Sequence, residues 1–470
     1  MKRILTLLFL MGLLAIVPGC GTDHKKDDVL TLRICNWEEY IDEGDWDKED
    51  TISLENGDII GKNNMIDDFT AWYKKTYGKT IHVEYSCFGT NEELYNQLTL
   101  GDEFDLVCPS EYMIMKLMTE QKLLKLSDDF FDTSKKENYY SRGVSSYIKD
   151  KFNTITIENE PLSSYAAGYM WGNTGIVYNP EKVTEEEASS WKLLLDPKFK
   201  RQVTMKDNVR DAYFAAMGIY KSDDLLSLQA SPYLGSDLTQ EEQLKEEYPA
   251  TLQKEMNDAS KDTIAAIEQL LQKGKDNFYS FETDSGKSDM VTGKVVANLQ
   301  WSGDATYSLD QAEEDGLTLC YSVPQECSNL WFDGWVMLKN NSMTKEKRKA
   351  CEAFMNFISR PDNVVRNMDY IGYTSVIAGE DDTILNYAKW CYEAEEDDTD
   401  TIDYDVSSFF GKKGTSITTT KDQEKRQLFA MYPPEDVLNR CTIMEYFGPE
   451  TTKRLNQMWI NVRCYRPFSK

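Results

Sequence analysis

Histidine is nearly absent from this chain: only His24 and His82 occur among 470 residues. A catalytic triad built on histidine would have to use His82, because His24 lies in a short polar stretch near the start. His82 falls in the alternating pattern Ile81-His82-Val83-Glu84-Tyr85, which is typical of a half-buried strand. A histidine-rich metal site is excluded. We therefore expect no bound metal and no cofactor.

The ten cysteines include no Cys-x-x-Cys pair, so the chain lacks the usual spacing of redox and zinc motifs. Cys35 and Cys108 lie in apolar runs, where we expect them to behave as small buried hydrophobic residues. Cys320 and Cys327 could form a local disulfide, but their spacing alone does not fix the pairing.

Beyond the N-terminus, the chain lacks any run of about eighteen apolar residues, which a membrane-spanning helix would need. The N-terminal run, Ile4 to Val17, is shorter and follows two basic residues, as in a secretory signal peptide. Small residues then precede Cys20. This predicts a lipoprotein signal peptide over residues 1–19, lipid on Cys20, and a lipidated polar tether over residues 20–29. The alternative is an ordinary signal peptide that contains a cysteine by chance.

Basic residues are outnumbered, since 52 Lys and Arg face 80 Asp and Glu, for a net charge of −28. This surplus disfavours binding to nucleic acid or to anionic lipid surfaces. It is compatible with cationic ligands, but we expect most of it to serve solubility, because exposed charges are screened within about 8 Å at physiological salt. The 10 Trp and 27 Tyr are many. Such rings often line sugar or cation sites, although most of them are expected in the core.

The first part of the mature chain alternates between strand and helix patterns. Apolar runs predict strands over residues 30–35, 80–85 and 104–108. Apolar residues at helical spacing predict a helix that ends at Gly78 and a second helix around residues 94–98. This order is typical of an α/β fold with a mostly parallel sheet.

Ligands of parallel sheets bind beyond the carboxyl ends of the strands. Trp37 and Tyr40 follow the first predicted strand, and Ser110 and Tyr112 follow the third. We expect these four side chains to meet at one edge of the sheet and to contribute to a ligand site. Each of them alone is equally compatible with an ordinary turn.

The rest of the chain continues the α/β pattern without internal repeats. Glycines join two extended pieces within residues 168–179, which we interpret as a crossover between domains. Acidic stretches over residues 42–61 and 382–405 are expected to be surface insertions, the second with some helix. Further strands are predicted over residues 203–205, 295–301, 321–324 and 331–338, and further helices over residues 207–217, within 236–275, and over residues 351–358 and 451–462.

Eight short motifs occur in one order along the chain. They are Asn36-Trp37-x-x-Tyr40, Phe104-Asp105-Leu106-Val107-x-Pro109-Ser110-x-Tyr112, Trp171-Gly172-x-Thr174-Gly175-Ile176, Trp191 through Pro197-x-Phe199-Lys200, Arg210-Asp211, Trp301-Ser302-Gly303-Asp304, Trp331-Phe332-Asp333 and Ile371-Gly372-Tyr373. Each motif alone is weak, but in this order they resemble the spermidine/putrescine-binding receptors of polyamine ABC transporters. The resemblance covers most of the mature chain, and the acidic insertions make this chain longer than the usual member.

The resemblance implies a two-lobed α/β fold of the type II periplasmic-binding-protein kind, in which each lobe is a mostly parallel sheet flanked by helices and a hinge joins the lobes. The expected parts are a first lobe over residues 30–172, a second lobe over residues 173–332, a return segment to the first lobe over residues 333–374, and a C-terminal part of the second lobe, with an acidic insertion, over residues 375–470. The implied function is not enzymatic. A lipid-anchored monomer outside the bacterial cell membrane would deliver a polyamine to the permease subunits of an ABC importer.

The resemblance also implies a set of ligand contacts. They are Trp37, Tyr40, Ser110 and Tyr112 from the first lobe, Asp211, Trp301, Asp304, Trp331 and Asp333 from the second lobe and the hinge, and Tyr373 from the return segment. Glu445 is our choice for one more polar contact near the C-terminus. Spermidine-preferring receptors that resemble this chain have an acid where Asn208 stands. Putrescine-preferring ones resemble it at Asp304 and have an acid at the position of Glu39, so we add Glu39 and favour putrescine, with spermidine next. Glu39 is equally compatible with a solvated loop charge.

Polyamine chemistry suits these residue types. A polyamine is a methylene chain with ammonium groups, so it needs flat apolar walls and carboxylates. The expected walls are Trp37, Trp301 and Trp331, and the expected anions are Asp211, Asp304 and Asp333. An unpaired buried charge costs several kcal/mol, so the number and position of the carboxylates set the specificity.

Two other functions fit the same composition. A secreted glycoside hydrolase also combines aromatic rings with paired carboxylates, but it needs an open groove and a carboxylic acid of raised pKa opposite a second carboxylate. A receptor for a sugar or another organic cation could use the same fold. Three carboxylates among stacked rings favour a cation over a neutral sugar, for which more Asn, Gln and Arg would be expected.

Overall fold

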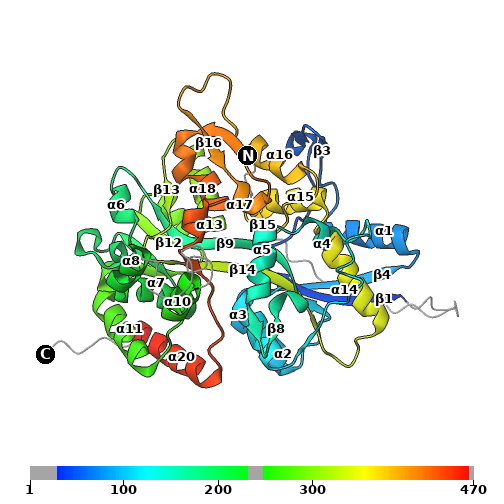
Figure 1. The fold of residues 1–470 in the computed structure, drawn as a ribbon, viewed down its shortest axis with the longest axis horizontal. Helices are drawn as coiled ribbons and strands as arrows, with labels where there is room; N and C mark the ends of the chain where they lie inside the picture. Colours follow the sequence, from blue (N-terminus) through cyan, green and yellow to red (C-terminus); the bar gives the residue numbers. More distant parts are fainter. Residues whose placement is uncertain (1–28, 231–246, 465–470) are drawn as a thin grey trace, which may run out of the picture.

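The computed structural model describes residues 29–230 and 247–464, whose elements form two lobes side by side (Figure 1). One sheet network runs through both lobes in the order β11-β10-β12-β9-β14-β5-β1-β4. The first lobe is built on the parallel strands β4, β1 and β5, and the second on the parallel strands β11, β10 and β12. The antiparallel strands β9 and β14 lie between the two sets. The expected two-lobed α/β architecture with mostly parallel sheets is confirmed.

The elements of the first lobe are β1 (Leu30–Trp37), β2 (Ile52–Leu54), β3 (Gly57–Ile59), α1 (Met65–Tyr77), β4 (Ile81–Phe88), α2 (Asn91–Leu100), β5 (Leu106–Val107), α3 (Glu111–Thr119), β6 (Leu123–Leu124), α4 (Tyr139–Gly143), α5 (Ser146–Thr154), β7 (Thr156–Ile157), β8 (Glu160–Pro161), α14 (Lys345–Ile358) and α15 (Pro361–Ile371). Those of the second lobe are α6 (Glu185–Ala188), β10 (Val203–Lys206), α7 (Val209–Tyr220), α8 (Ser222–Ala230), α10 (Tyr248–Met256), α11 (Lys261–Gly274), β11 (Phe278–Glu282), α12 (Gly286–Val291), β12 (Ala297–Trp301), α13 (Ser302–Glu314), β13 (Cys320–Ser322) and α20 (Pro449–Cys464).

Two long strands, β9 (Ala166–Tyr178) and β14 (Ser328–Leu338), cross the middle of the molecule in Figure 1. Every residue in both strands is buried. β9 pairs with β14 as far as Asn173 and with β12 from Thr174 onward, so both lobes share it. The two extended pieces predicted within residues 168–179 are therefore one continuous strand.

The predicted elements of the first lobe are largely confirmed. The helix expected to end at Gly78 is α1, and Gly78 has the left-handed φ of 68° that closes many helices. Strand β4 extends to Phe88, three residues beyond its predicted end. In the second lobe, Asn208 caps α7, because its side-chain oxygen accepts hydrogen bonds from the backbone amides of Arg210 and Asp211.

The remaining elements follow β15 (Thr374–Ser375), which pairs with β9. They are α16 (Thr383–Tyr392), β16 (Thr401–Asp405), α17 (Ser407–Phe410), β17 (Ser416–Thr420), α18 (Gln427–Met431), α19 (Glu435–Leu438) and β18 (Cys441–Thr442). Helix α16 contacts α15 and β2 of the first lobe, whereas α18 contacts α13 of the second. The chain after residue 375 thus packs on both lobes, and the domain boundaries given above stay predictions.

Both acidic stretches are better packed than expected. Within residues 42–61, Asp42, Trp46 and Ile52 are buried, so the prediction of a surface insertion is wrong there. The reason is an ion pair made far along the chain, described below. Within residues 382–405, α16 buries Ile384 and Tyr387.

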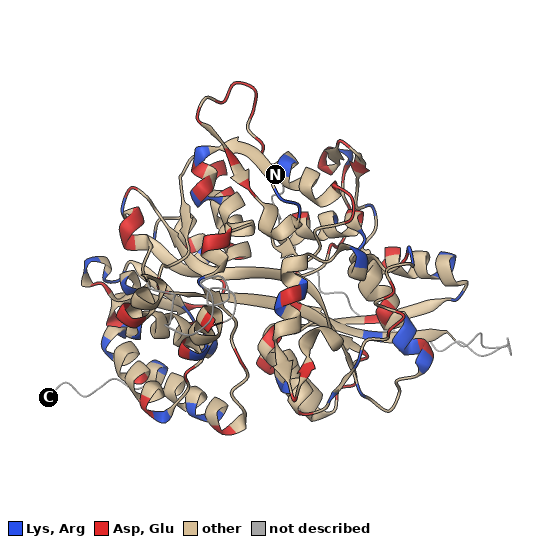
Figure 2. Ribbon diagram, in the orientation of Figure 1, with Lys and Arg blue, Asp and Glu red and all other residues tan. Residues whose placement is uncertain are grey.

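Acidic residues are spread over both lobes in Figure 2, with a run in the loop between α16 and β16. All nine cysteines from Cys35 to Cys464 are free, so the local Cys320–Cys327 disulfide is absent. Within residues 29–230 and 247–464, no helix has both the length and the apolar character needed to cross a membrane. The predicted signal peptide and tether, including Cys20, lie outside the described residues apart from Val29.

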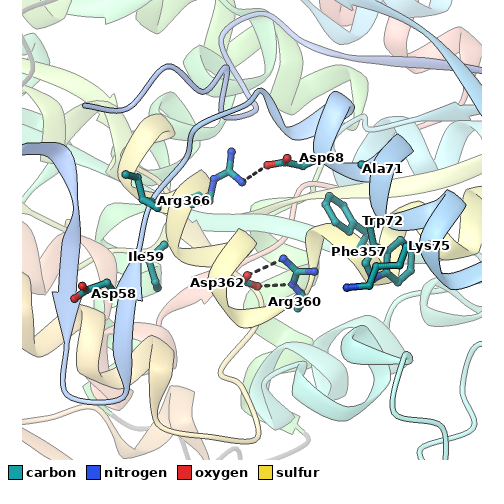
Figure 3. A pocket seen from close by; sticks show the side chains of 11 residues that line it. Asp58, Ile59, Asp68, Ala71, Trp72, Lys75, Phe357, Arg360, Asp362 and Arg366 are labelled. Atoms are coloured by element: carbon teal, nitrogen blue, oxygen red, sulfur yellow. Dashed lines mark hydrogen bonds and ion pairs between the residues drawn. The ribbon is translucent and has the colours of Figure 1, made fainter. Parts of the chain in front are cut away.

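A buried ion pair ties the stretch after β1 to α15. Arg366 donates from Nε to Asp42 at 2.7 Å and from Nη1 to Asp68 at 2.7 Å, and Nη2 bonds the carbonyl of Asn63 at 2.7 Å. Asp42 is fully buried and Arg366 nearly so. The pair lies beside a cavity of about 410 Å³, where Arg360 likewise pairs with Asp362 (Figure 3). The arginines of this cavity are therefore compensated by neighbouring carboxylates.

Replacing Arg366 by methionine is expected to destabilise the protein by about 3–5 kcal/mol, because Asp42 would be left buried without its cation. Urea unfolding followed by circular dichroism measures the loss. The double variant Asp42→Asn with Arg366→Met should recover part of it. The control is Arg33→Met, which breaks an exposed pair with Glu84 and should cost far less, because solvent screens that pair. Equal losses in the two single variants would contradict the assignment.

Candidate functional site

The segments predicted to carry ligand contacts converge where the two lobes meet. The loop after β1 brings Tyr40, the start of α3 brings Ser110, and β14 brings Asp333. The first turn of α13 carries Asp304. Tyr373, in the segment after α15, donates a hydrogen bond to this carboxylate. Five predicted residues are thus linked directly by side-chain contacts.

Asp333 is buried and is held by neutral donors. Tyr40 donates its hydroxyl to one carboxylate oxygen at 2.8 Å, and Ser110 donates to the other at 2.7 Å. Within the described residues, no Lys or Arg nitrogen forms an ion pair with it. Burial raises the pKa of Asp333 to about 6, although the two hydroxyl bonds act in the opposite direction. Among the residues that the structure describes, this carboxylate therefore lacks a cationic partner.

Asp333 lies where β14 meets the start of α3, because its backbone forms an antiparallel bridge with Ser110. The pairing of β14 with β9 shifts register at the same place, since two residues of β9, Tyr169 and Met170, lie opposite Asp333. Glu111, which the sequence analysis missed, accepts the backbone amide of Phe332 at 3.0 Å. Glu111 is buried, and burial raises its pKa to about 8, so its carboxyl group is mostly protonated at neutral pH. Glu111 thus anchors β14 at the residue before Asp333.

Asp304 is compensated within the protein, unlike Asp333. Tyr373 donates to one of its oxygens at 3.0 Å, and Lys206 Nζ lies 3.3 Å from the other. Lys287 Nζ is 3.8 Å away. The sequence analysis missed both lysines. The only local signal for Lys206 was a basic residue at the end of an otherwise apolar strand.

Aromatic rings lie between the two aspartates. Tyr373 meets Tyr40 edge-on at 5.6 Å between ring centres and meets Trp331 at 5.4 Å. Trp331 donates its indole N–H to the carbonyl of Asn173 at 3.3 Å. Gly303 allows Tyr373 to approach, because a Cβ there would lie 1.6 Å from the tyrosine ring. A wall of rings therefore joins Asp333 to Asp304.

Asp211 and Trp301 lie together in the second lobe. Asp211 stands in the first turn of α7 and is buried. The Trp301 side chain hydrogen-bonds its carboxylate, but burial has the larger effect and raises the pKa of Asp211 to about 6. As with Asp333, no ion pair to Asp211 occurs among the described side chains.

Tyr112 and Glu445 lie around Arg210 rather than around the aspartates. The Arg210 guanidinium stacks over the Tyr112 ring at 5.1 Å and over the Phe447 ring at 4.4 Å, and it donates to the backbone carbonyl of Glu445. The Glu445 carboxylate is exposed and accepts from Gln253 at 2.9 Å. Arg210 itself was missed as a contact between the lobes.

Trp37 and Glu39 lie at the end of β1. The Trp37 ring packs on Phe88 at 4.7 Å between centres, and its indole N–H is buried without a hydrogen-bond acceptor in the described structure. Glu39 is exposed, has a left-handed φ of 52°, and forms no ion pair with any described residue. The structure thus shows no hydrogen bond or ion pair between the Glu39 carboxylate and the other predicted residues, all of which it describes.

Comparisons with known proteins show the family of this chain and its fold. The chain matches the family of bacterial extracellular solute-binding proteins over residues 64–390. The putrescine-binding periplasmic protein PotF of Escherichia coli is 25% identical over 474 residues, which cover 98% of each chain. The spermidine/putrescine-binding periplasmic protein of Escherichia coli is 25% identical over 76% of this chain and 81% of its own.

A solved structure supports the fold. A spermidine/putrescine ABC transporter substrate-binding protein from Streptococcus pneumoniae aligns with a TM-score of 0.57 and 21% identity over 93% of this chain and 100% of that one. This likeness confirms the expected type II periplasmic-binding-protein fold. Because the family match spans more than half of its length, the chain belongs to the bacterial extracellular solute-binding proteins.

Proposed function

We propose that this chain is the lipid-anchored receptor of an ABC importer, that it binds a polyamine, putrescine in preference to spermidine, and that it delivers this ligand to the membrane permease without catalysing a reaction. The observation that carries the proposal is Asp333. It is a buried carboxylate with which no described Lys or Arg pairs, and it is held by two hydroxyl groups beside aromatic rings where the lobes meet.

An ammonium group would complete this arrangement. It would neutralise Asp333, and the faces of neighbouring rings would add roughly 0.5–2 kcal/mol each once water is excluded. The rings of Tyr40, Tyr373 and Trp331 offer apolar surface for a methylene chain. The names of the two Escherichia coli relatives, a putrescine-binding and a spermidine/putrescine-binding protein, support the same ligand class.

Calorimetric titration of the chain from residue 29 with putrescine, spermidine, spermine and a maltodextrin tests the ligand class. The amines are expected to bind, putrescine most tightly, and the maltodextrin should give no heat of binding. Asp333→Asn and Trp301→Ala should each weaken putrescine binding at least tenfold, because one removes a counter-charge and the other a wall of the site.

Two matched variants serve as controls for this titration. Asp310→Asn alters another aspartate of α13 whose pKa burial raises to about 6, but Asp310 bonds Gln427 instead of facing the candidate site. Trp390→Ala removes a half-exposed tryptophan. Both should bind putrescine like the unaltered chain. Normal affinity in Asp333→Asn and Trp301→Ala together would place the ligand elsewhere, and binding of the maltodextrin alone would favour a sugar receptor.

The affinity for putrescine is expected to depend on pH through Asp333 and Asp211. Each has its pKa raised from 3.8 to about 6 in the ligand-free protein, and each must be ionised to pair with an ammonium group. Affinity should therefore be constant above about pH 7 and fall as the pH drops below about 6, by up to tenfold per pH unit for each carboxyl group. Calorimetry from pH 5 to pH 8 measures this slope. The Asp333→Asn variant should show a shallower slope, and an affinity that rises on acidification would contradict the proposal.

The lipid anchor is tested at Cys20. In the full chain expressed in a bacterium, Cys20→Ser is expected to abolish labelling by radioactive palmitate and to release the protein from the membrane fraction. Cys35→Ser, which alters a buried cysteine of β1, should leave both properties intact. Continued labelling of the Cys20→Ser protein would rule out this site of lipidation.

A further inference from the structure

Lys206 is a fully buried lysine at the centre of the second lobe. It ends β10 and is 0% exposed. Its Nζ bonds the carbonyl of Thr283 at 2.8 Å and lies 3.3 Å from Asp304 and 3.5 Å from Glu282. Burial at this depth is rare for lysine unless the charge is compensated, and two carboxylates compensate it here.

The same ammonium group lies 4.3 Å from the centre of the Trp301 ring. Lys206 therefore makes the two contacts that a ligand ammonium would make, a carboxylate on one side and an indole face on the other. Because Lys206 is part of the protein chain, its ammonium group stays at Asp304 whether or not a ligand is bound.

The charges that remain differ between the aspartates. Asp304 has Lys206 at 3.3 Å and Lys287 at 3.8 Å. Asp333 and Asp211 are buried, and the described residues supply neither of them with an ion-pair partner. Both therefore gain from an external cation, whereas Asp304 has little left to gain.

We infer that Lys206 is a built-in cation that fills the ammonium position between Trp301 and Asp304, so that a bound polyamine places its ammonium groups at Asp333 and Asp211 only. The inference rests on the proposed function and names the residue that selects among polyamines. A diamine finds one carboxylate for each end. A triamine brings a third ammonium group, which would be desolvated without a free carboxylate.

The test is the ratio of spermidine affinity to putrescine affinity in Lys206→Met, measured by calorimetry at pH 7.5. Removing the lysine frees Asp304, so this ratio should rise at least tenfold over that of the unaltered chain. Adding Asp304→Asn to Lys206→Met should abolish the rise. Separately, Asp211→Asn should weaken putrescine binding at least tenfold.

Lys221→Met is the matched control, because Lys221 is another largely buried lysine of the second lobe that pairs with two carboxylates, those of Glu255 and Asp258. The ratio of spermidine affinity to putrescine affinity in Lys221→Met should equal that of the unaltered chain. Circular dichroism and thermal unfolding check that each variant folds. If Lys206→Met does not fold, Lys206→Met with Glu282→Gln removes one charge of each sign and takes its place.

The outcomes separate two failures. An unchanged ratio in a folded Lys206 variant would overturn this inference while leaving the proposed function intact. Putrescine affinity that is unaffected by Asp211→Asn would do the same. No binding of any amine to the unaltered chain would refute the proposed function and this inference with it.

Discussion

A carboxylate that leaves water must find a cation or strong hydrogen-bond donors, and the buried aspartates of this protein meet that requirement in different ways. Asp42 forms an ion pair with Arg366, and Asp304 forms one with Lys206. From the described part of the chain, Asp333 receives only the hydroxyl groups of Tyr40 and Ser110. The first solution holds a segment in place and the second balances charge within one lobe. The third leaves a negative charge that a molecule from outside can complement.

The backbone places that unbalanced charge where the lobes join. Strand β14 pairs with β9 and β5, and Asp333 itself forms a backbone bridge with Ser110. At the start of α3, Ser110 bonds the carboxylate of Asp333, and Glu111 bonds the backbone amide of Phe332. Two adjacent residues of the first lobe thus hold a part of β14 that lies between the two lobes. Any ligand that neutralises Asp333 acts at the junction itself.

Much of the fold could be predicted because its signals are local. Helical spacing and Gly78 gave α1, and the loops after β1 and β5 gave Tyr40 and Ser110. The ion pairs could not be predicted, because Lys206 lies 98 residues from Asp304 and Arg366 lies 324 residues from Asp42. No periodicity connects such partners. For the same reason the stretch after Asp42 looked like an exposed acidic insertion, although a distant arginine anchors it.

Asn208 illustrates how charge and local structure combine in the second lobe. Its side chain caps α7 and so orients the first turn that carries Asp211. An aspartate would cap the helix equally well, so the cap alone does not explain an amide at this position. The difference is one negative charge beside Asp211. Asn208 is neutral and therefore adds no negative charge there. Lys206 neutralises the negative charge of Asp304. On the proposed function, both residues lower the number of ammonium groups that this lobe could neutralise, which favours a ligand with fewer cations.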